Sequence, residues 1–511
     1  MSAMSAMPFV SGIHRAGTLA LVLLAASCST RKSYVAAPSV MMAPREVLAE
    51  PTTGESYHDW GKNPWVDASK DHLSTFAADV DTASYTIMRR KLNEGVLPPP
   101  AAVRVEEYVN YFRYALPDPA PGSPFAVVMD AAPSPLAPEH LILRVAVGTQ
   151  ARPAAEHKPM RLVFLVDVSG SMASPDKLPL AKQALQILTN NLGPRDTVSL
   201  VTYAGDTRVV LPPTGLDRKA RILAAIDELG ASGSTAMGSG LDLAYSQALL
   251  GVEPGVTSRV IVCTDGDTNV GPQGQQAILG IIASRAKAGI SLSTIGFGMG
   301  NYKDALMEQL ADQGNGNNFY IDSFAAAKKI FQDELGATLE VVAKDVKLQV
   351  DFDPAQVARY RLVGYENRTV ADQDFRNDRV DAGQVGPGHQ VTAMYELALT
   401  DAARRAPAPL GVVRIRHKAP DGDGAATERT FAMAAPPAAS FAAAPADLRF
   451  AFAVAAFADL LRGQDEATRW SLDAIAEVAR ASAGGDADRQ ELVALVEKAR
   501  QLRGTAAVVA H

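Results

Sequence analysis

The chain has 511 residues, of which 47% are hydrophobic, and this length allows about three domains with a sizeable core. Lys and Arg number 49 against 56 Asp and Glu, which gives a net charge of −7, and no basic block occurs, so nucleic acid is not expected as a partner. The cysteines Cys28 and Cys263 lie in a leader and in an apolar strand, so no disulfide between them is expected.

The first residues have the composition of a secretory leader. His14 and Arg15 precede an apolar run from Thr18 to Ala26. This run is too short to span a bilayer, which takes about 20 apolar residues, but it has the length of the hydrophobic region of a signal peptide. We therefore expect residues 1–27 to be a signal peptide.

A cysteine follows the apolar run. The segment Leu24-Ala-Ala-Ser-Cys28 resembles a bacterial lipobox, which implies that Cys28 is diacylated and becomes the new N-terminus; the alternative is an ordinary leader cut near Ala26. Several acyl chains would attach the protein stably to a membrane. Ser29 comes next, and the absence of Asp there resembles an outer-membrane sorting signal of enteric-type bacteria. We expect a lipid-anchored protein of the bacterial cell envelope, at the outer membrane and facing the periplasm or the cell surface.

Residues 28–70 are rich in Pro, Ala, Ser and Thr without apolar periodicity, so we expect a flexible tether. An N-terminal region of helices and strands is predicted at 71–158. Its elements are expected at Tyr85–Asn93, Val103–Phe112, Phe125–Met129 and Leu141–Val147.

Two acids precede the first of these helices. Asp79 and Asp81 lie just before Thr82. A metal-binding role is one interpretation, but capping of the helix together with Thr82 is the simpler one.

Residues 159–338 alternate apolar strands with segments of helical length. The predicted strands are Leu162–Asp167, Thr197–Tyr203, Arg208–Leu211, Val260–Thr264, Ile290–Ile295 and Phe319–Ile321. The predicted helices are Leu178–Leu192, Lys219–Leu229, Gly240–Leu250, Gln275–Ala288 and Ala325–Leu339. This alternation is typical of an α/β fold with a doubly wound, mostly parallel sheet.

The first of these strands ends in one acid and two spaced hydroxyls. Its apolar residues, Leu162–Val166, are of the kind that is buried on both faces of a parallel sheet, so Asp167 is expected at the carboxyl edge, where such sheets bind ligands. Asp167, Ser169 and Ser171 alternate along the chain, so their oxygens can converge in a turn. Carboxylate and hydroxyl oxygens suit Mg²⁺ or Mn²⁺ rather than zinc.

The pattern Asp-x-Ser-x-Ser resembles the metal-ion-dependent adhesion site of von Willebrand factor type A (VWA) domains. That family also has a threonine and a second aspartate on later loops, and this chain has Thr235 in Gly233-Ser-Thr-Ala236 and Asp265 after the strand Val260–Thr264. The resemblance covers 159–338 and implies a site in which the hydroxyls bind the metal directly while the carboxylates act mainly through water. The site residues are Ser169, Ser171, Thr235, Asp167 and Asp265.

The sequence lacks the residues that hydrolase and zinc chemistry would need. An aspartyl-phosphate hydrolase needs a second acid two positions after Asp167, where Ser169 stands. No Gly-x-Ser-x-Gly elbow surrounds either serine, and no two of the eight histidines have metal-ligand spacing. The sequence therefore predicts neither an enzyme nor a small-molecule substrate.

Strands return after the α/β region. They are predicted at Val346–Phe352, Ala358–Tyr365, Val391–Leu397 and Gly411–His417, within a β-rich region at 339–432. Strands on both sides of the α/β region predict a β-sandwich built from both flanks.

A C-terminal helical region is predicted at 445–511. Its first helix carries one apolar stripe, formed by Phe450, Val454, Phe457 and Leu461. This region, together with the segments around Asp81 and Tyr108, resembles the parts that accompany the type A domain in a family of bacterial lipoproteins.

Two functions fit this interpretation. In the preferred one, the cation keeps an open coordination position that an acidic side chain of a partner protein fills, in adhesion or complex assembly. In the alternative, the protein is structural, the metal only stabilises the loops, and the β-sandwich and C-terminal helices make the contacts.

Overall fold

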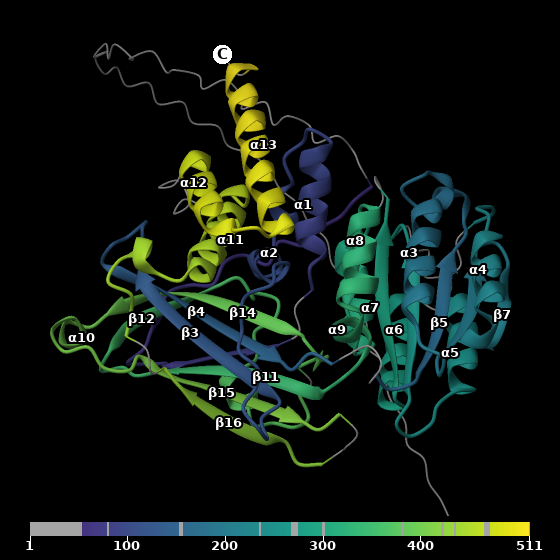
Figure 1. Ribbon diagram of the computed structural model, residues 1–511, viewed down its shortest axis with the longest axis horizontal. Coiled ribbons are helices and arrows are strands. Elements are labelled where there is room, and N and C mark those ends of the chain that lie inside the picture. The colour runs from purple at the N-terminus through teal and green to yellow at the C-terminus, as the bar shows by residue number, and fades with distance from the viewer. Residues whose placement is uncertain are drawn as a thin grey trace, which may run out of the picture. The chain divides into compact units, whose positions relative to one another are not determined.

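An α/β part, a β-sandwich and a group of helices make up the unit from Thr53 to His511 (Figure 1). The computed structural model describes residues 54–78, 81–152, 157–234, 237–266, 274–298, 302–380, 382–420, 424–433, 436–463 and 471–509.

The α/β part is built on a 6-stranded sheet with the order β10-β9-β8-β5-β6-β7. The strands are β5 (Met160–Asp167), β6 (Thr197–Tyr203), β7 (Thr207–Gly215), β8 (Thr257–Thr264), β9 (Ile290–Phe297) and β10 (Asn318–Ile321). Neighbouring strands are parallel except β7, which runs antiparallel to β6. The prediction of a mostly parallel sheet is therefore confirmed.

Helices cover both faces of this sheet, as Figure 1 shows. They are α3 (Leu178–Asn191), α4 (Lys219–Asp227), α5 (Met237–Leu249), α6 (Gly274–Lys287), α7 (Asp304–Gln313), α8 (Phe324–Lys328) and α9 (Leu335–Leu339), with a π-helical turn at Lys329–Asp333 between the last two. Alternation along β5 explains the two layers: Phe164 and its neighbours two positions away pack with α3, α4 and α8, whereas Val163 and Leu165 pack with α5, α6 and α7.

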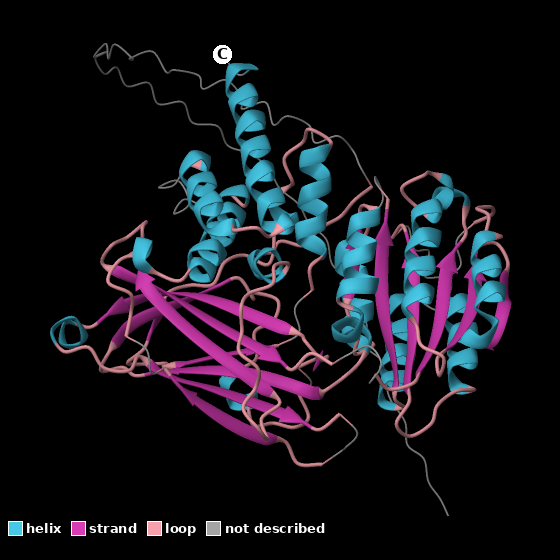
Figure 2. Cartoon of the chain, in the orientation of Figure 1, coloured by secondary structure: helices cyan, strands magenta, loops and turns pink. Residues whose placement is uncertain are grey.

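The β-sandwich, whose strands are magenta in Figure 2, takes strands from both sides of the α/β part in the sequence, as the colours of Figure 1 show. One sheet contains β1 (Val66–Asp67), β12 (Val357–Val363), β14 (Gln390–Leu399), β4 (His140–Thr149) and β3 (Phe125–Pro133), in that order. The other contains β13 (Gln384–Val385), β11 (Ala343–Phe352), β15 (Gly411–Lys418) and β16 (Thr427–Ala432), with β2 (Leu73–Ala77) also pairing with β11. Alternate residues of β4 and β11 face a shared apolar core, so the predicted sandwich from both flanks is confirmed.

Five helices outside the α/β part share one core. They are α1 (Ala83–Asn93), α2 (Val105–Asn110), α11 (Ala446–Leu461), α12 (Leu472–Ala483) and α13 (Ala487–Val509), whereas the short helix α10 (Asp401–Arg405) has no residue in this core. Ile142 of β4 and Met394 of β14 belong to the same core, so these helices cover the outer face of one sandwich sheet. The predicted C-terminal helices are thus joined by helices from the N-terminal region. Within the described ranges, no helix combines the length and the apolar character that crossing a membrane requires.

The end of the predicted tether is part of the folded unit. Val66 in β1 pairs with Tyr360, and Ser56 forms a bridge with Lys303. The Glu55 carboxylate is buried and forms ion pairs with two basic residues of α1. These contacts place residues 54–70 on the folded unit. The sequence did not predict this, because pairing through a few residues needs no apolar periodicity and so leaves no pattern in the sequence.

Candidate metal site

Two neighbouring parallel strands bring the predicted acids to one edge of the α/β sheet. Strand β5 ends at Asp167, and β8 ends one residue before Asp265. Val166 is the register partner of Cys263, so Asp167 and Asp265 leave adjacent strands at nearly the same level. This edge is the carboxyl end of the parallel strands, as the sequence predicted.

Hydrogen bonds fix the carboxylate of Asp167, which is fully buried. Its Oδ1 accepts the backbone N–H of Ser169 at 2.8 Å, and its Oδ2 accepts the hydroxyl of Thr264 at 3.2 Å. Burial raises the pKa of Asp167 to about 6, the bonds from Ser169 lower it, and the Asp265 carboxylate raises it. A cation at this point would favour the ionised carboxylate, which burial chiefly, and the neighbouring acid to a lesser extent, disfavour.

The two serines lie beside this carboxylate. Ser169 Oγ and Ser171 Oγ are 3.0 Å apart; the first is buried and the second is exposed. A 3₁₀ turn at Gly170–Ala173 follows Ser169. The hydroxyls thus run from the buried acid towards solvent, where an ion bound to them could also contact an external ligand.

The loop that precedes Thr235 is attached to the serine loop. Gly170 N–H donates to Gly233 O at 3.0 Å, and Ser232 N–H donates to Val168 O at 2.6 Å. Thr235 itself lies outside the described residues, so its role stays a prediction.

A lysine that the sequence analysis did not consider lies in this site. Lys177 Nζ donates to Asp265 Oδ2 at 2.9 Å, and both side chains are buried. Lys177 directly precedes α3 and is 88 positions away from Asp265 in the sequence. No spacing rule links positions so far apart, and only the alignment of β5 with β8 brings them together.

The donor set fits a hard divalent cation. Asp167, Asp265, Ser169 and Ser171 offer only oxygen atoms, which suit Mg²⁺ or Mn²⁺. In the described ranges, this edge included, no three His, Cys, Asp or Glu side chains are grouped to hold a metal, so the hydroxyls would have to supply part of the ligand set here. A bound ion would supply positive charge and a coordination position for an acidic ligand.

Asp81, which precedes α1, makes structural contacts. Asp81 Oδ1 accepts the backbone N–H of Asn318 at 2.8 Å, and Asp81 Oδ2 pairs with Arg368 at 2.7 Å. Thr82 occupies the N-cap position of α1 but makes no capping bond with its side chain. The side chain of Asp81 therefore connects parts of the fold, and the capping interpretation is replaced by this contact. Asp79 lies outside the described residues. The predicted lipidation site, Cys28, also lies outside them.

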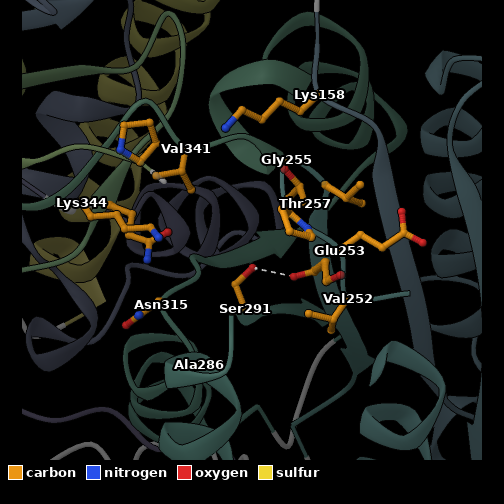
Figure 3. A pocket seen from close by; sticks show the side chains of 16 residues that line it. Lys158, Val252, Glu253, Gly255, Thr257, Ala286, Ser291, Asn315, Val341 and Lys344 are labelled. Atoms are coloured by element: carbon orange, nitrogen blue, oxygen red, sulfur yellow. Dashed lines mark hydrogen bonds between the residues drawn. The ribbon is translucent and has the colours of Figure 1, made fainter. Parts of the chain in front are cut away.

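A cavity of about 410 Å³ lies at the opposite edge of the α/β sheet (Figure 3). Thr257 and Ser291, near the amino ends of β8 and β9, line it, and Lys344 lines it from the sandwich. Because Asp167 and Asp265 follow carboxyl ends of strands, this cavity is not part of the predicted metal site.

Sequence-family models cover most of the described chain. A model described as von Willebrand factor type A domain matches residues 162–333. One described as von Willebrand factor matches residues 51–144, and one described as uncharacterized protein YfbK, C-terminal, matches residues 337–502.

Individual proteins match over different shares of the chain. The uncharacterized protein YfbK of Escherichia coli is 39% identical over 478 residues, which cover 88% of this chain and 82% of that protein. The uncharacterized protein sll0103 of Synechocystis is 28% identical over 236 residues, covering 46% of this chain and 55% of that protein. A solved structure, von Willebrand factor type A from Catenulispora acidiphila, is 19% identical with a TM-score of 0.41, covering 73% of this chain and 89% of that one.

Proposed function

This chain belongs to the family of the Escherichia coli protein YfbK and contains a VWA domain, and on that basis we propose that it binds a protein partner through a divalent cation. The partner supplies an acidic side chain to the ion. The role is adhesion or complex assembly, without turnover of a substrate.

One observation carries this proposal: Asp167, Ser169, Ser171 and Asp265 lie at one edge of the sheet, and the hydroxyls extend from the buried acid to the surface. An ion held mainly by neutral hydroxyls keeps most of its charge and attracts a carboxylate from outside. The ion is Mg²⁺ or Mn²⁺, and Thr235 completes the set of protein ligands.

The protein acts at the cell envelope. Lipidation of Cys28 anchors it in the outer membrane, and neither nucleic acid nor a small-molecule substrate takes part. This part of the proposal rests on the lipobox-like segment that ends at Cys28. Cys28→Ser should release the protein from the membrane fraction and abolish incorporation of labelled fatty acid, whereas Cys263→Ser should leave both unchanged.

Capture from envelope extracts tests the binding function. Immobilised protein should retain a specific partner with Mg²⁺ present and lose it with EDTA. The double variant Ser169→Ala, Ser171→Ala should not retain the partner even with Mg²⁺. Ser174→Ala is the matched control, because Ser174 lies on the same loop but bonds to Asp176.

The same experiment separates the structural alternative. If the metal only stabilises the loops, EDTA should lower the melting temperature while the partner remains bound. Equal capture with and without Mg²⁺ would refute metal-dependent recognition.

A further inference from the structure

Lys177 brings a positive charge into the predicted metal site. Its ammonium lies 2.9 Å from Asp265 Oδ2, and only 10% of its side chain is exposed. Asp265 is fully buried and lies close enough to Asp167 to raise the pKa of that acid. A buried ion pair often stabilises a fold no better than apolar side chains of similar volume, so stability alone does not explain this pair.

The surroundings hold the lysine in this position. A Cβ added to Gly298 would lie 2.1 Å from Lys177 Cγ, so only glycine leaves room for the lysine side chain. Gly298 also has a φ of +75°, which favours glycine. Its carbonyl accepts bonds from Arg90 Nη1, at 3.3 Å, and from the Tyr320 hydroxyl. The loop beside Lys177 is therefore fixed from its other side.

We propose that Lys177 sets the charge of the site so that a divalent cation bound there still requires an acidic ligand. This inference rests on the proposed function and assigns to Lys177 a role in specificity for carboxylates. Lys177 is a positioning and charge-setting residue, not a ligand of the metal.

The charges explain how this works. Among the described residues at this edge, two carboxylates and one ammonium sum to one negative charge, and a divalent ion would reverse this sum to one positive charge. A carboxylate from a partner then neutralises the site. Without the ammonium, the two nearby aspartates would offset more of the charge of the ion, and the electrostatic attraction for a partner acid would weaken.

Neutralising Lys177 should therefore change two affinities in opposite directions. The metal should bind more tightly, because the repulsion from the ammonium is gone, and a carboxylate should bind the loaded site more weakly. A lysine with a purely structural role would weaken both affinities together when it is removed.

The test uses Mn²⁺ and acetate as probes on the full chain. Free Mn²⁺ is measured by electron paramagnetic resonance, and acetate binding by the loss of water-proton relaxation at bound Mn²⁺. Lys177→Gln keeps a hydrogen-bond donor for Asp265 and removes the charge. It should bind Mn²⁺ about tenfold more tightly and acetate about tenfold more weakly, each a difference of about 1.4 kcal/mol.

Further variants serve as controls. Lys177→Arg keeps the charge and should retain both wild-type affinities. Lys182→Gln removes the same charge from α3, where Lys182 bonds to the carbonyl oxygens of Asp227 and Leu229, and should also match the wild type. Lys177→Met is a second neutral variant, and the melting temperature of each protein verifies folding.

The outcomes distinguish the two proposals. If the unaltered protein binds no Mn²⁺, the proposed function fails and this inference fails with it. If the unaltered protein binds Mn²⁺ but both neutral variants bind it equally or more weakly, only the role of Lys177 is refuted. Unchanged acetate binding in the neutral variants refutes that role as well.

Discussion

The two acidic residues of α2 are buried, and each accepts a hydrogen bond from another part of the fold. Glu107 accepts the backbone N–H of Ser84 at 2.8 Å and pairs with Arg104. Among the described residues, no basic side chain forms an ion pair with Glu106; its Oε2 accepts the backbone N–H of Tyr365 at 2.9 Å. Burial, followed by the carboxylates of Glu366 and Glu107, raises the pKa of Glu106 to about 7, although the bond from Tyr365 lowers it.

Glu106 should make the free energy of unfolding depend on pH. The pKa of Glu106 is about 7 in the folded protein, and its ordinary value of 4.5 applies to the unfolded chain. Between pH 4.5 and about 7, the folded protein therefore binds a proton at Glu106 that the unfolded chain does not bind. This contribution to stability is present below about pH 4.5 and declines as the pH rises to about 7, by up to about 1.4 kcal/mol per pH unit.

Glu106→Gln should remove this contribution. The free energy of unfolding of the variant minus that of the wild type should be larger at pH 8 than at pH 5, as measured by urea unfolding. Glu94→Gln, a change in a side chain with 30% exposure at the end of α1, is the control. A difference between wild type and Glu106→Gln that stays the same at both pH values would contradict the prediction.

Among the elements, α11 is more deeply buried than its sequence pattern indicates. The predicted stripe of Phe450, Val454, Phe457 and Leu461 is buried, as expected. Phe452, off that stripe, is also only 6% exposed. Helices α2 and α12 and the outer face of a sandwich sheet surround α11, so nearly every side of it contacts apolar groups.

Phe457→Ala should destabilise the protein by about 3–5 kcal/mol, because Phe457 is fully buried and its removal leaves a cavity in the shared helical core. Chemical denaturation gives the value. Leu250→Ala is the control: Leu250 is 70% exposed, so the change should stay within about 0.5 kcal/mol. Equal effects of the two substitutions would show that α11 is not part of the cooperative core.

At the scale of the whole molecule, Arg368 joins the parts of the fold. It follows β12 of the sandwich and bonds to Glu308 at 3.0 Å and to Asp312 at 2.8 Å, both on α7 of the α/β part. It also pairs with Asp81, at 2.7 Å, just before α1. One guanidinium therefore connects the sandwich, the α/β part and the helical part.

Arg368→Met should destabilise the protein by about 3–5 kcal/mol, because it leaves buried carboxylates without their cation. Arg376→Met is matched to it: Arg376 is 64% exposed and pairs with Glu428, so its loss should cost less than about 1 kcal/mol. Differential scanning calorimetry measures both. A melting temperature of Arg368→Met equal to that of the control would refute the role of Arg368 as a connector.

Local patterns in the sequence predicted much of this architecture. The apolar run before Asp167, the spacing of Ser169 and Ser171, and the second acid after β8 indicated a parallel sheet with oxygen ligands at its carboxyl edge. Strands on both flanks also indicated the sandwich. Such features can be read from the sequence because burial on a strand or helix repeats over a few neighbouring residues.

Only the tertiary structure decided the contacts between distant residues. Three such contacts leave no periodic signal in the sequence. They are the pairing of Lys177 with Asp265, the bond between Asp81 and Arg368, and the incorporation of residues 54–70 into the folded unit. Each depends on which strands become neighbours and on the burial that makes a charge require a partner. The sequence by itself determined the fold type and the edge of the sheet at which Asp167 and Asp265 lie, whereas the folded chain determined which charged side chain lies beside them.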